Sequence, residues 1–188
     1  MSEPRLMPEM ELTDGQFAAR TFRTSDAESM WEAATESIAE IYRWLPWCHP
    51  DYEVGESEAW IAARPAAWVR REELSFAVTD AVTGRFLGGC GLNQFHPTHR
   101  MANLGYWIRT SAAGRGAASA AAILVARFGF RVLGLQRIEI LADVDNYASQ
   151  RVAEKAGAQR EGRLRNRLFH HQHVRDGVMF SLTPADVA

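Results

Sequence analysis

The sequence predicts an α/β fold built on a mixed, largely antiparallel sheet with helices packed against it. Strand-like apolar runs alternate with helical stretches, and one such run leads through the turn Gly114-Arg115-Gly116 into a helix rich in alanine. The chain has 188 residues, which is enough to bury a substantial core and close to the size of one domain. We therefore expect a single domain over residues 1–188, with about residues 1–12 loose.

The first half of the chain predicts strands and two helices. Ser25 or Asp26 can cap an amphipathic helix that continues towards Trp44, and the break at residues 45–50 separates it from a second helix. These two helices are expected to flank the opening for an acceptor. The elements predicted from apolar periodicity are a strand over Phe17 to Arg23, a helix over Gly55 to Arg71, a hairpin of Leu74 to Thr79 with Phe86 to Phe95, and a strand over Ala102 to Arg109.

The second half begins with a helix after Gly116 that is apolar nearly all round, which predicts burial against the sheet. Residues 137–143 read as the next strand. A further helix opens at residues 145–149 and ends at residues 154–158, and alternation in residues 163–168 indicates a late strand.

The Gly114-x-Gly116 turn predicts a site for an anionic ligand. A helix start carries unpaired N–H groups and the positive end of the peptide dipole, and glycine lets a pyrophosphate approach the main chain closely. The competing interpretation is a dinucleotide fingerprint, with Glu139 near the expected acidic position. That motif requires a third glycine where Ser119 stands, which weakens the dinucleotide interpretation.

The order of the motifs resembles the GNAT superfamily of N-acetyltransferases, within it the RimJ/RimL-like branch that acetylates protein N-terminal amines. The motifs that carry the resemblance are Gly88-Gly89-Cys90-Gly91-Leu92, the strand 104–108, the turn 114–118, Asn146 with Ser149, and the runs 155–158 and 161–165. The resemblance implies a V-shaped splay between the fourth and fifth strands, those carrying Tyr106 to Arg109 and Ile138 to Ala142, which opens a slot for the thioester arm of acetyl-CoA.

The resemblance also implies roles for individual residues. Ser149 is expected to protonate the departing CoA thiolate, Asn146 to fix the pantetheine amides, and N–H groups near Trp107 and Ile108 to polarise the thioester carbonyl. Ala113 departs from the basic or amide residue usual at the start of the pyrophosphate loop. The expected acetyl-CoA site comprises Trp107, Ile108, Arg109, Gly114, Arg115, Gly116, Ala117, Ala118 and Asn146.

No general base is evident from the sequence. Asn103 stands where related sequences often have Glu, which leaves Glu139, His96 and His99 as alternatives. His170, His171 and His173 gather on a predicted turn, but no cysteine or carboxylate pattern accompanies them, so we expect no metal site and a minor role at the acceptor groove. Asn146 and Ser149 also have a purely structural interpretation, as the cap and first turn of a helix.

The acceptor is expected to be an amine that binds near Trp44 and Trp47, because these rings flank a helix-breaking proline. A protein or peptide N-terminal α-amine is favoured. The alternatives are a small-molecule amine (an aminoglycoside, polyamine or amino acid) and a non-catalytic acyl-CoA-binding module.

Composition narrows the partners and the location. The formal net charge of −2 gives no general attraction to nucleic acid or anionic membrane. Cys48 and Cys90 lack disulfide or metal spacing, and no apolar run is long enough to cross a bilayer. We expect a soluble, cytoplasmic enzyme with reduced thiols, which is compatible with a homodimer.

Overall fold

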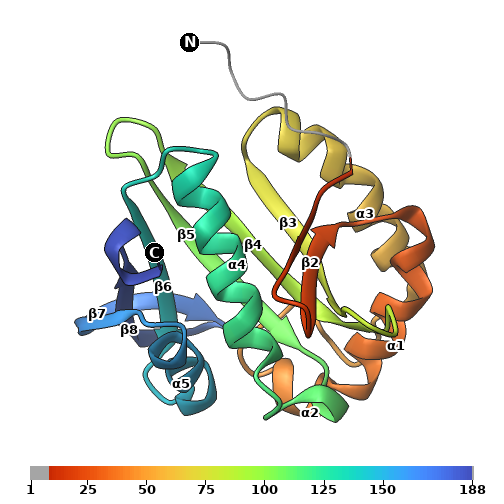
Figure 1. Ribbon diagram of the computed structural model, residues 1–188. Coiled ribbons are helices and arrows are strands. Elements are labelled where there is room, and N and C mark those ends of the chain that lie inside the picture. The colour runs from red at the N-terminus through yellow and green to blue at the C-terminus, as the bar shows by residue number, and fades with distance from the viewer. Residues whose placement is uncertain (1–8, 188) are drawn as a thin grey trace.

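The computed structural model describes residues 9–187, which form an eight-stranded sheet flanked by helices on both faces (Figure 1). The strand order is β1-β2-β3-β4-β5-β6-β8-β7. The strands are β1 (Glu11–Thr13), β2 (Phe17–Thr21), β3 (Glu73–Asp80), β4 (Phe86–His96), β5 (Met101–Ile108), β6 (Arg137–Asp143), β7 (Gln159–His170) and β8 (His173–Leu182). The helices are α1 (Ala27–Glu36), α2 (Ile38–Ile41), α3 (Val54–Val69), α4 (Ala117–Arg131) and α5 (Tyr147–Lys155), with 3₁₀ turns η1 (Thr24–Asp26), η2 (Thr110–Ala112) and η3 (Pro184–Val187).

Successive residues of the central strands point to opposite faces of the sheet and contribute to two different hydrophobic cores. Phe76 of β3 packs against Phe128 of α4, with ring centroids 5.6 Å apart, in the large core between the sheet and α4. The next residue, Ala77, faces the smaller core formed with α1 and α3. Figure 1 shows α4 lying across one face of the sheet, with α1 and α3 on the other. The short connection between Ile108 and Ala117, which includes η2, keeps the start of α4 close to the end of β5.

The sheet splits where its only parallel pair among the described strands begins to diverge. β5 and β6 pair at Met101 with Arg137, Ala102 with Ile138, and Asn103 with Glu139, and no ladder pair follows. β5 continues to pair with β4 as far as Ile108, and β6 with β8 as far as Asp143. The two strands are therefore open towards their carboxyl ends. This confirms the predicted mixed, largely antiparallel sheet and its V-shaped splay. The splay lies between the fifth and sixth strands of the chain, not the fourth and fifth, because Glu11–Thr13 forms an additional strand at the start.

Two boundaries differ from the sequence predictions. The first long helix does not run unbroken towards Trp44, because Ser37 leaves helical geometry between α1 and α2 and its hydroxyl donates to the carbonyl of Ala33 at 2.7 Å. Ordered structure also begins earlier than residue 13, since Glu11–Thr13 pairs with β2. Residues 1–8 of the segment expected to be loose lie outside the described residues.

Within residues 9–187, no helix combines the length and the apolar character needed to cross a membrane.

Candidate active site

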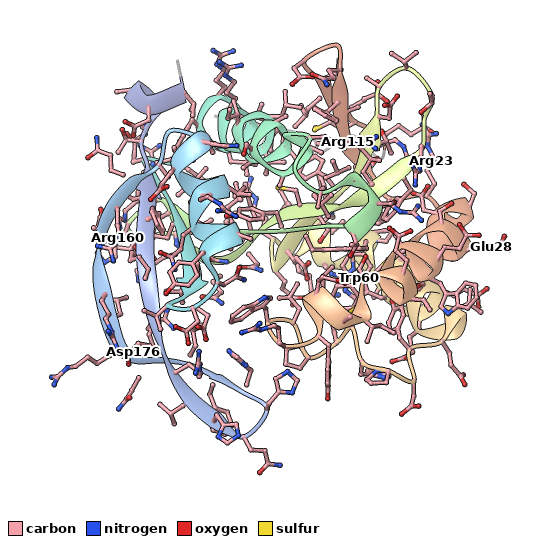
Figure 2. All side chains as sticks on the ribbon, turned by 90° about the horizontal axis from the view of Figure 1, so that it is seen from below. Arg23, Glu28, Trp60, Arg115, Arg160 and Asp176 are labelled. Carbon is pink, nitrogen blue, oxygen red and sulfur yellow. The ribbon has the colours of Figure 1, made fainter. Side chains whose placement is uncertain are left out.

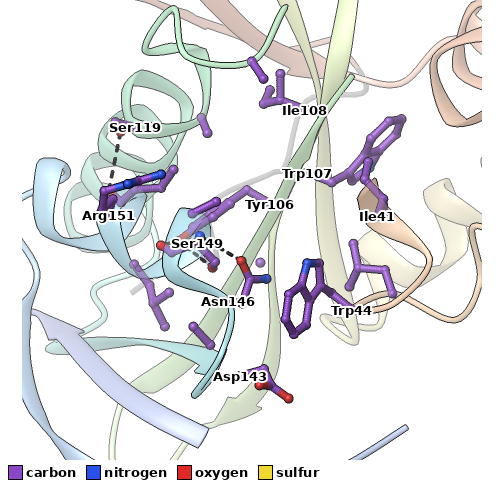
Figure 3. Close-up of a pocket in the computed structure, with 18 of the residues that line it drawn as sticks. Ile41, Trp44, Tyr106, Trp107, Ile108, Ser119, Asp143, Asn146, Ser149 and Arg151 are labelled. Atoms are coloured by element: carbon purple, nitrogen blue, oxygen red, sulfur yellow. Dashed lines mark hydrogen bonds between the residues drawn. The ribbon is translucent and has the colours of Figure 1, made fainter. Parts of the chain in front are cut away.

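A cavity of about 890 Å³ occupies the splay between β5 and β6 (Figure 3). Its walls come from the end of β5, the start of α4, the end of β6 with the start of α5, and the segment after α2. Ile41 and Trp44 lie on one side of the β5 strand, and Asn146 and Ser149 lie on the other. The cavity therefore joins the predicted anion site to the predicted acceptor side.

The start of α4 has the geometry expected of an anion site. Gly116 occupies the N-cap position with φ of 91°, a left-handed conformation that favours glycine, and Gly114 has φ of 77°. Ala117, Ala118 and Ser119 follow and line the cavity. The first N–H groups of a helix have no intrahelical partner, so this end of α4 offers several donors and the positive end of its dipole.

Two cations that sequence reasoning missed face the same region. Arg151 and Lys155 line the cavity from α5, and neither side chain forms an ion pair or hydrogen bond with the rest of residues 9–187. Their spacing of four places them on one helix face, which is the signal in the sequence that could have found them. Arg115 (labelled in Figure 2) is exposed and does not line the cavity, and its contact with the ligand stays a prediction. Ala113 does line it, but its methyl side chain offers no basic or amide group.

The open edge of β5 presents main-chain groups to the cavity. The N–H of Arg109 donates to the carbonyl of Leu87 on β4 at 2.8 Å, and a Cβ built on Gly88 would meet the carbonyl of Trp107 at 2.1 Å. Because main-chain groups alternate in direction along a strand, Ile108 and Tyr106 point theirs away from β4 into the splay. Of the two predicted donors, Ile108 is well placed, whereas the Trp107 N–H faces β4. Trp107 still contributes its side chain to the lining.

Arg109 has a structural place outside the cavity. Its guanidinium, only 11% exposed, forms an ion pair with Glu36 at the end of α1 and donates to the carbonyl of Phe86 at 3.3 Å. The same carboxylate accepts from the N–H of Ser111 at 2.8 Å, and these donors lower the pKa of Glu36 to about 2. Arg109 thereby clamps the connection between β5 and α4, and its contact with a ligand stays a prediction.

Asn146 and Ser149 lie together at the start of α5. The side-chain oxygen of Asn146 accepts from the N–H of Ser149 at 3.0 Å, so Asn146 is the helix cap that the structural interpretation required. The cap uses only the oxygen and leaves the amide nitrogen as a donor towards the cavity. Tyr106, a residue that sequence reasoning missed, places its phenol oxygen 2.8 Å from the carbonyl oxygen of Ser149 and 3.2 Å from its hydroxyl. Burial raises the pKa of Tyr106 well above its ordinary value.

The two acceptor candidates belong to different cavities. Trp44 lines the large cavity, but Trp47 lines a second cavity of about 480 Å³ between the sheet and the helices α1 and α3. Trp47 packs edge-on against Trp107, with ring centroids 5.2 Å apart. Both cavities are bordered by Leu45, Asn93, Gly105, Tyr106 and Trp107, so they meet at β5.

The second cavity is mainly aromatic. Trp47, Trp60 and Phe22 contribute to its wall, and Figure 2 shows Trp60 on the α1 and α3 side of the molecule. Its carboxylates are already paired: Glu73 bonds Arg64 at 2.6 Å, and Glu56 bonds His49 at 3.1 Å. Cys90 also borders it, but burial raises the pKa of this thiol to about 12, which excludes a thiolate nucleophile at neutral pH.

None of the three residues proposed as general bases lines either cavity. Glu139 forms an ion pair with Arg137 at 3.0 Å, while His96 and His99 stack on each other at the exposed turn between β4 and β5. Asn103 does reach the large cavity, and its amide donates to Asn93 at 2.9 Å. Within residues 9–187, no cluster of three or more His, Cys, Asp or Glu side chains could hold a metal ion.

One histidine of the predicted turn does enter the large cavity. His170 lines it from the end of β7, and its Nε2 lies 3.2 Å from Oδ2 of Asp143, which also lines it. The two residues are far apart in sequence and meet only through the pairing of β6, β8 and β7.

Comparison with known proteins identifies the family. A family model described as an acetyltransferase (GNAT) domain matches residues 17–159. YdaF of Bacillus subtilis (strain 168), named as a ribosomal N-acetyltransferase, is 33% identical over 99 residues, which are 53% of this chain and 54% of YdaF. The chain thus aligns with about half the length of that curated relative.

Solved structures agree over nearly the whole chain. A Vibrio cholerae protein described as a ribosomal-protein-serine acetyltransferase has a TM-score of 0.84 at 30% identity, covering 95% of this chain and 100% of that one. RimL, described as a ribosomal L7/L12 alpha-N-protein acetyltransferase in complex with coenzyme A, has a TM-score of 0.83 at 18% identity, covering 96% and 99%, a likeness of fold. With its split sheet, its glycine-led α4 and the match over residues 17–159, the chain belongs to the GNAT acetyltransferase family.

Proposed function

We propose that the protein transfers the acetyl group of acetyl-CoA to a primary amine, and that its acceptor is the N-terminal α-amine of a protein or peptide. The observation that carries the proposal is the continuity of one cavity from the start of α4, through the open edge of β5, to Trp44. The cavity offers an anion site for the pyrophosphate at the start of α4. Next to it lie main-chain groups of β5 for the amide-bearing pantetheine arm, followed by an apolar wall for the acceptor.

Different residues of the splay are suited to different parts of the acetyl transfer. The N–H groups of Ile108 and Tyr106, which point into the splay, are suited to polarise the thioester carbonyl. Arg151 and Lys155 add positive charge beside α4 for the phosphates. The amide nitrogen of Asn146 can donate to the pantetheine arm. Ser149 is suited to donate a proton to the departing thiolate.

Two observations support a peptide acceptor. The similar proteins from Bacillus subtilis and Vibrio cholerae carry names that refer to ribosomal acceptors. The second cavity meets the first at β5 and has aromatic walls, which suit the side chain of an N-terminal residue. Acetylation of ribosomal proteins would place the enzyme in the cytoplasm.

A cationic small molecule is the less favoured acceptor. Its attraction would depend on unpaired carboxylates, but Glu56 and Glu73 in the second cavity are already engaged by His49 and Arg64. Glu40 in the large cavity accepts from the Thr110 hydroxyl at 3.1 Å and is a single carboxylate, whereas a polycation would need several. Selectivity for α-amines over lysine also follows from acidity, because an α-amine with a pKa near 8 is far more often neutral at pH 7 than a lysine with a pKa near 10.4.

Mass spectrometry of acetylated products tests the proposal. The protein is incubated with acetyl-CoA and two panels, one of peptides with varied N-terminal residues and internal lysines, the other of aminoglycosides, polyamines and amino acids. We expect acetylation of peptide α-amines with lysine side chains largely untouched. Turnover of small amines alone would contradict the acceptor assignment, and binding of acetyl-CoA without any product would indicate an acyl-CoA-binding module.

A further inference from the structure

His170 is the titratable side chain of the β7–β8 hairpin that enters the large cavity. Its side chain is only 14% exposed, and its Nε2 lies 3.2 Å from Oδ2 of Asp143. Asp143 ends β6 on the same side of the splay as Asn146 and Ser149 (Figure 3). A histidine oriented by a carboxylate therefore borders the cavity that contains Ser149.

Asp143 is rigidly held and ionised. Its side chain is 3% exposed and accepts from the Nε and Nη2 atoms of Arg175 at 2.9 and 3.0 Å, and from the N–H of Asp145 at 2.9 Å. Although burial opposes ionisation, these donors together lower the pKa of Asp143 to about 2. A fixed carboxylate so close to an imidazole selects the tautomer with the proton on Nε2, which leaves Nδ1 as a proton acceptor.

The hairpin that carries His170 is fastened across the cavity. The neighbouring His171 places Nε2 2.7 Å from the carbonyl oxygen of Tyr42, just after α2, and its ring meets the Tyr42 ring edge-on at 4.5 Å. His170 in turn packs edge-on against His171, with centroids 5.6 Å apart. The imidazole is thus restrained by Asp143 on one side and by the anchored turn on the other.

We propose that His170 is the catalytic residue that accepts the proton of the acceptor amine, and that Asp143 is its positioning residue; this rests on the proposed acetyl transfer. The chain has no carboxylate at Asn103, where the resemblance would place a base, and the other candidates lie outside both cavities. His170 provides a base on the opposite wall of the splay instead.

The amine nitrogen attacks the thioester carbon, the C–N bond forms, and the C–S bond breaks with its electron pair passing to sulfur. The N–H proton passes to Nδ1 of His170. The thiolate takes the hydroxyl proton of Ser149, and water returns a proton to Ser149 as the imidazolium loses one.

Charged and titratable groups on every neighbouring element act on His170. Asp143 from β6 and Glu40 from α2 are carboxylates that line the same cavity as His170, and Arg175 from β8 is the cation bound to Asp143. Arg175 is itself paired with Asp145, so its charge is largely compensated. The remaining groups around the turn are His171, Tyr42 and His173, which pairs with His170 in the ladder.

Single-turnover rates of acetyl transfer to a peptide, followed against pH, test this assignment. His170→Gln keeps a donor for Asp143 but cannot accept the proton, so the rate should fall about 10²-fold and lose its acidic limb, with acetyl-CoA affinity nearly unchanged. The matched control is His171→Gln, which should retain the acidic limb. Asp143→Asn should slow the transfer and change its pH profile, because the imidazole loses the carboxylate that fixes its tautomer and orientation.

The outcomes separate this inference from the proposed function. A folded His170→Gln protein with the wild-type rate and pH profile would overturn the role of His170 while leaving acetyl transfer intact. Should that variant not fold, an Asp143→Asn profile that coincides with wild type would overturn it equally. Absence of acetylated product from the wild-type protein would overturn both.

Discussion

The side-chain hydroxyl of Tyr106 contacts both the carbonyl oxygen and the hydroxyl of Ser149 at the open end of the splay. The phenol lies 2.8 Å from the serine carbonyl oxygen and 3.2 Å from the serine hydroxyl, and its raised pKa keeps it protonated. Tyr106 has one proton, which it donates to the carbonyl. The serine hydroxyl lies within hydrogen-bond distance of the phenol oxygen, so β5 orients the side chain at the first turn of α5.

Ser149→Ala is expected to slow the chemical step more than binding. A positioned acid is worth about 10² to 10⁴-fold, and the CoA thiolate is already a fair leaving group, so we expect kcat to fall about 10²-fold with little change in acetyl-CoA affinity. Single-turnover kinetics at saturating substrates measure this. A wild-type chemical rate would leave Ser149 as no more than a first-turn helix residue.

Tyr106→Phe removes both contacts with Ser149 while keeping the buried ring. We expect kcat to fall about tenfold and the free energy of unfolding to fall by about 1 kcal/mol, since one buried hydrogen-bonding unit is lost. The double variant Tyr106→Phe/Ser149→Ala should be no slower than Ser149→Ala alone, because the tyrosine acts through the serine. Fully additive effects on kcat would show that the two residues work independently.

Gly116→Val is expected to abolish acetyl-CoA binding. Valine is strained at φ of 91° and adds a branched side chain where the pyrophosphate would meet the N–H groups of α4. The matched control is Gly84→Val in the turn between β3 and β4, where φ is 72° and a Cβ likewise has no neighbour within 4 Å. Calorimetry should find unchanged affinity for the control. Equal affinity in a folded Gly116→Val protein would refute the anion-site assignment.

Glu36→Gln tests the clamp on Arg109. The pKa of Glu36 is lowered from its ordinary value of 4.5 to about 2, so the pair contributes stability above about pH 4.5 and loses it as pH falls through about 2. For a partly exposed pair we expect about 1 kcal/mol at pH 7. Urea unfolding of both proteins at several pH values measures the difference, which should shrink towards zero in acid. A difference independent of pH would exclude this ion pair as its source.

Local patterns in the sequence predicted the fold well. The glycine turn, the alanine-rich helix and the alternation of residues 137–143 each depend on neighbours within a few positions, and each was found as expected. The fate of Arg109 could not be predicted in this way, because its partner Glu36 lies 73 residues away on α1. Asp143 and His170 are 27 residues apart and meet through two strand pairings, so no spacing rule connects them.

In the splay, residues 104–108 of β5 and residues 140–143 of β6 form no ladder pairs with each other. The β5–β6 ladder ends at the pair Asn103 and Glu139. An occupant that carries amide groups would hydrogen-bond to both strands beyond this pair, in the place that a further strand would take. The sheet is in this sense two half-sheets joined by the short ladder between β5 and β6. A ligand that bonds to both strands would connect the halves further and protect amide hydrogens on both strands from exchange.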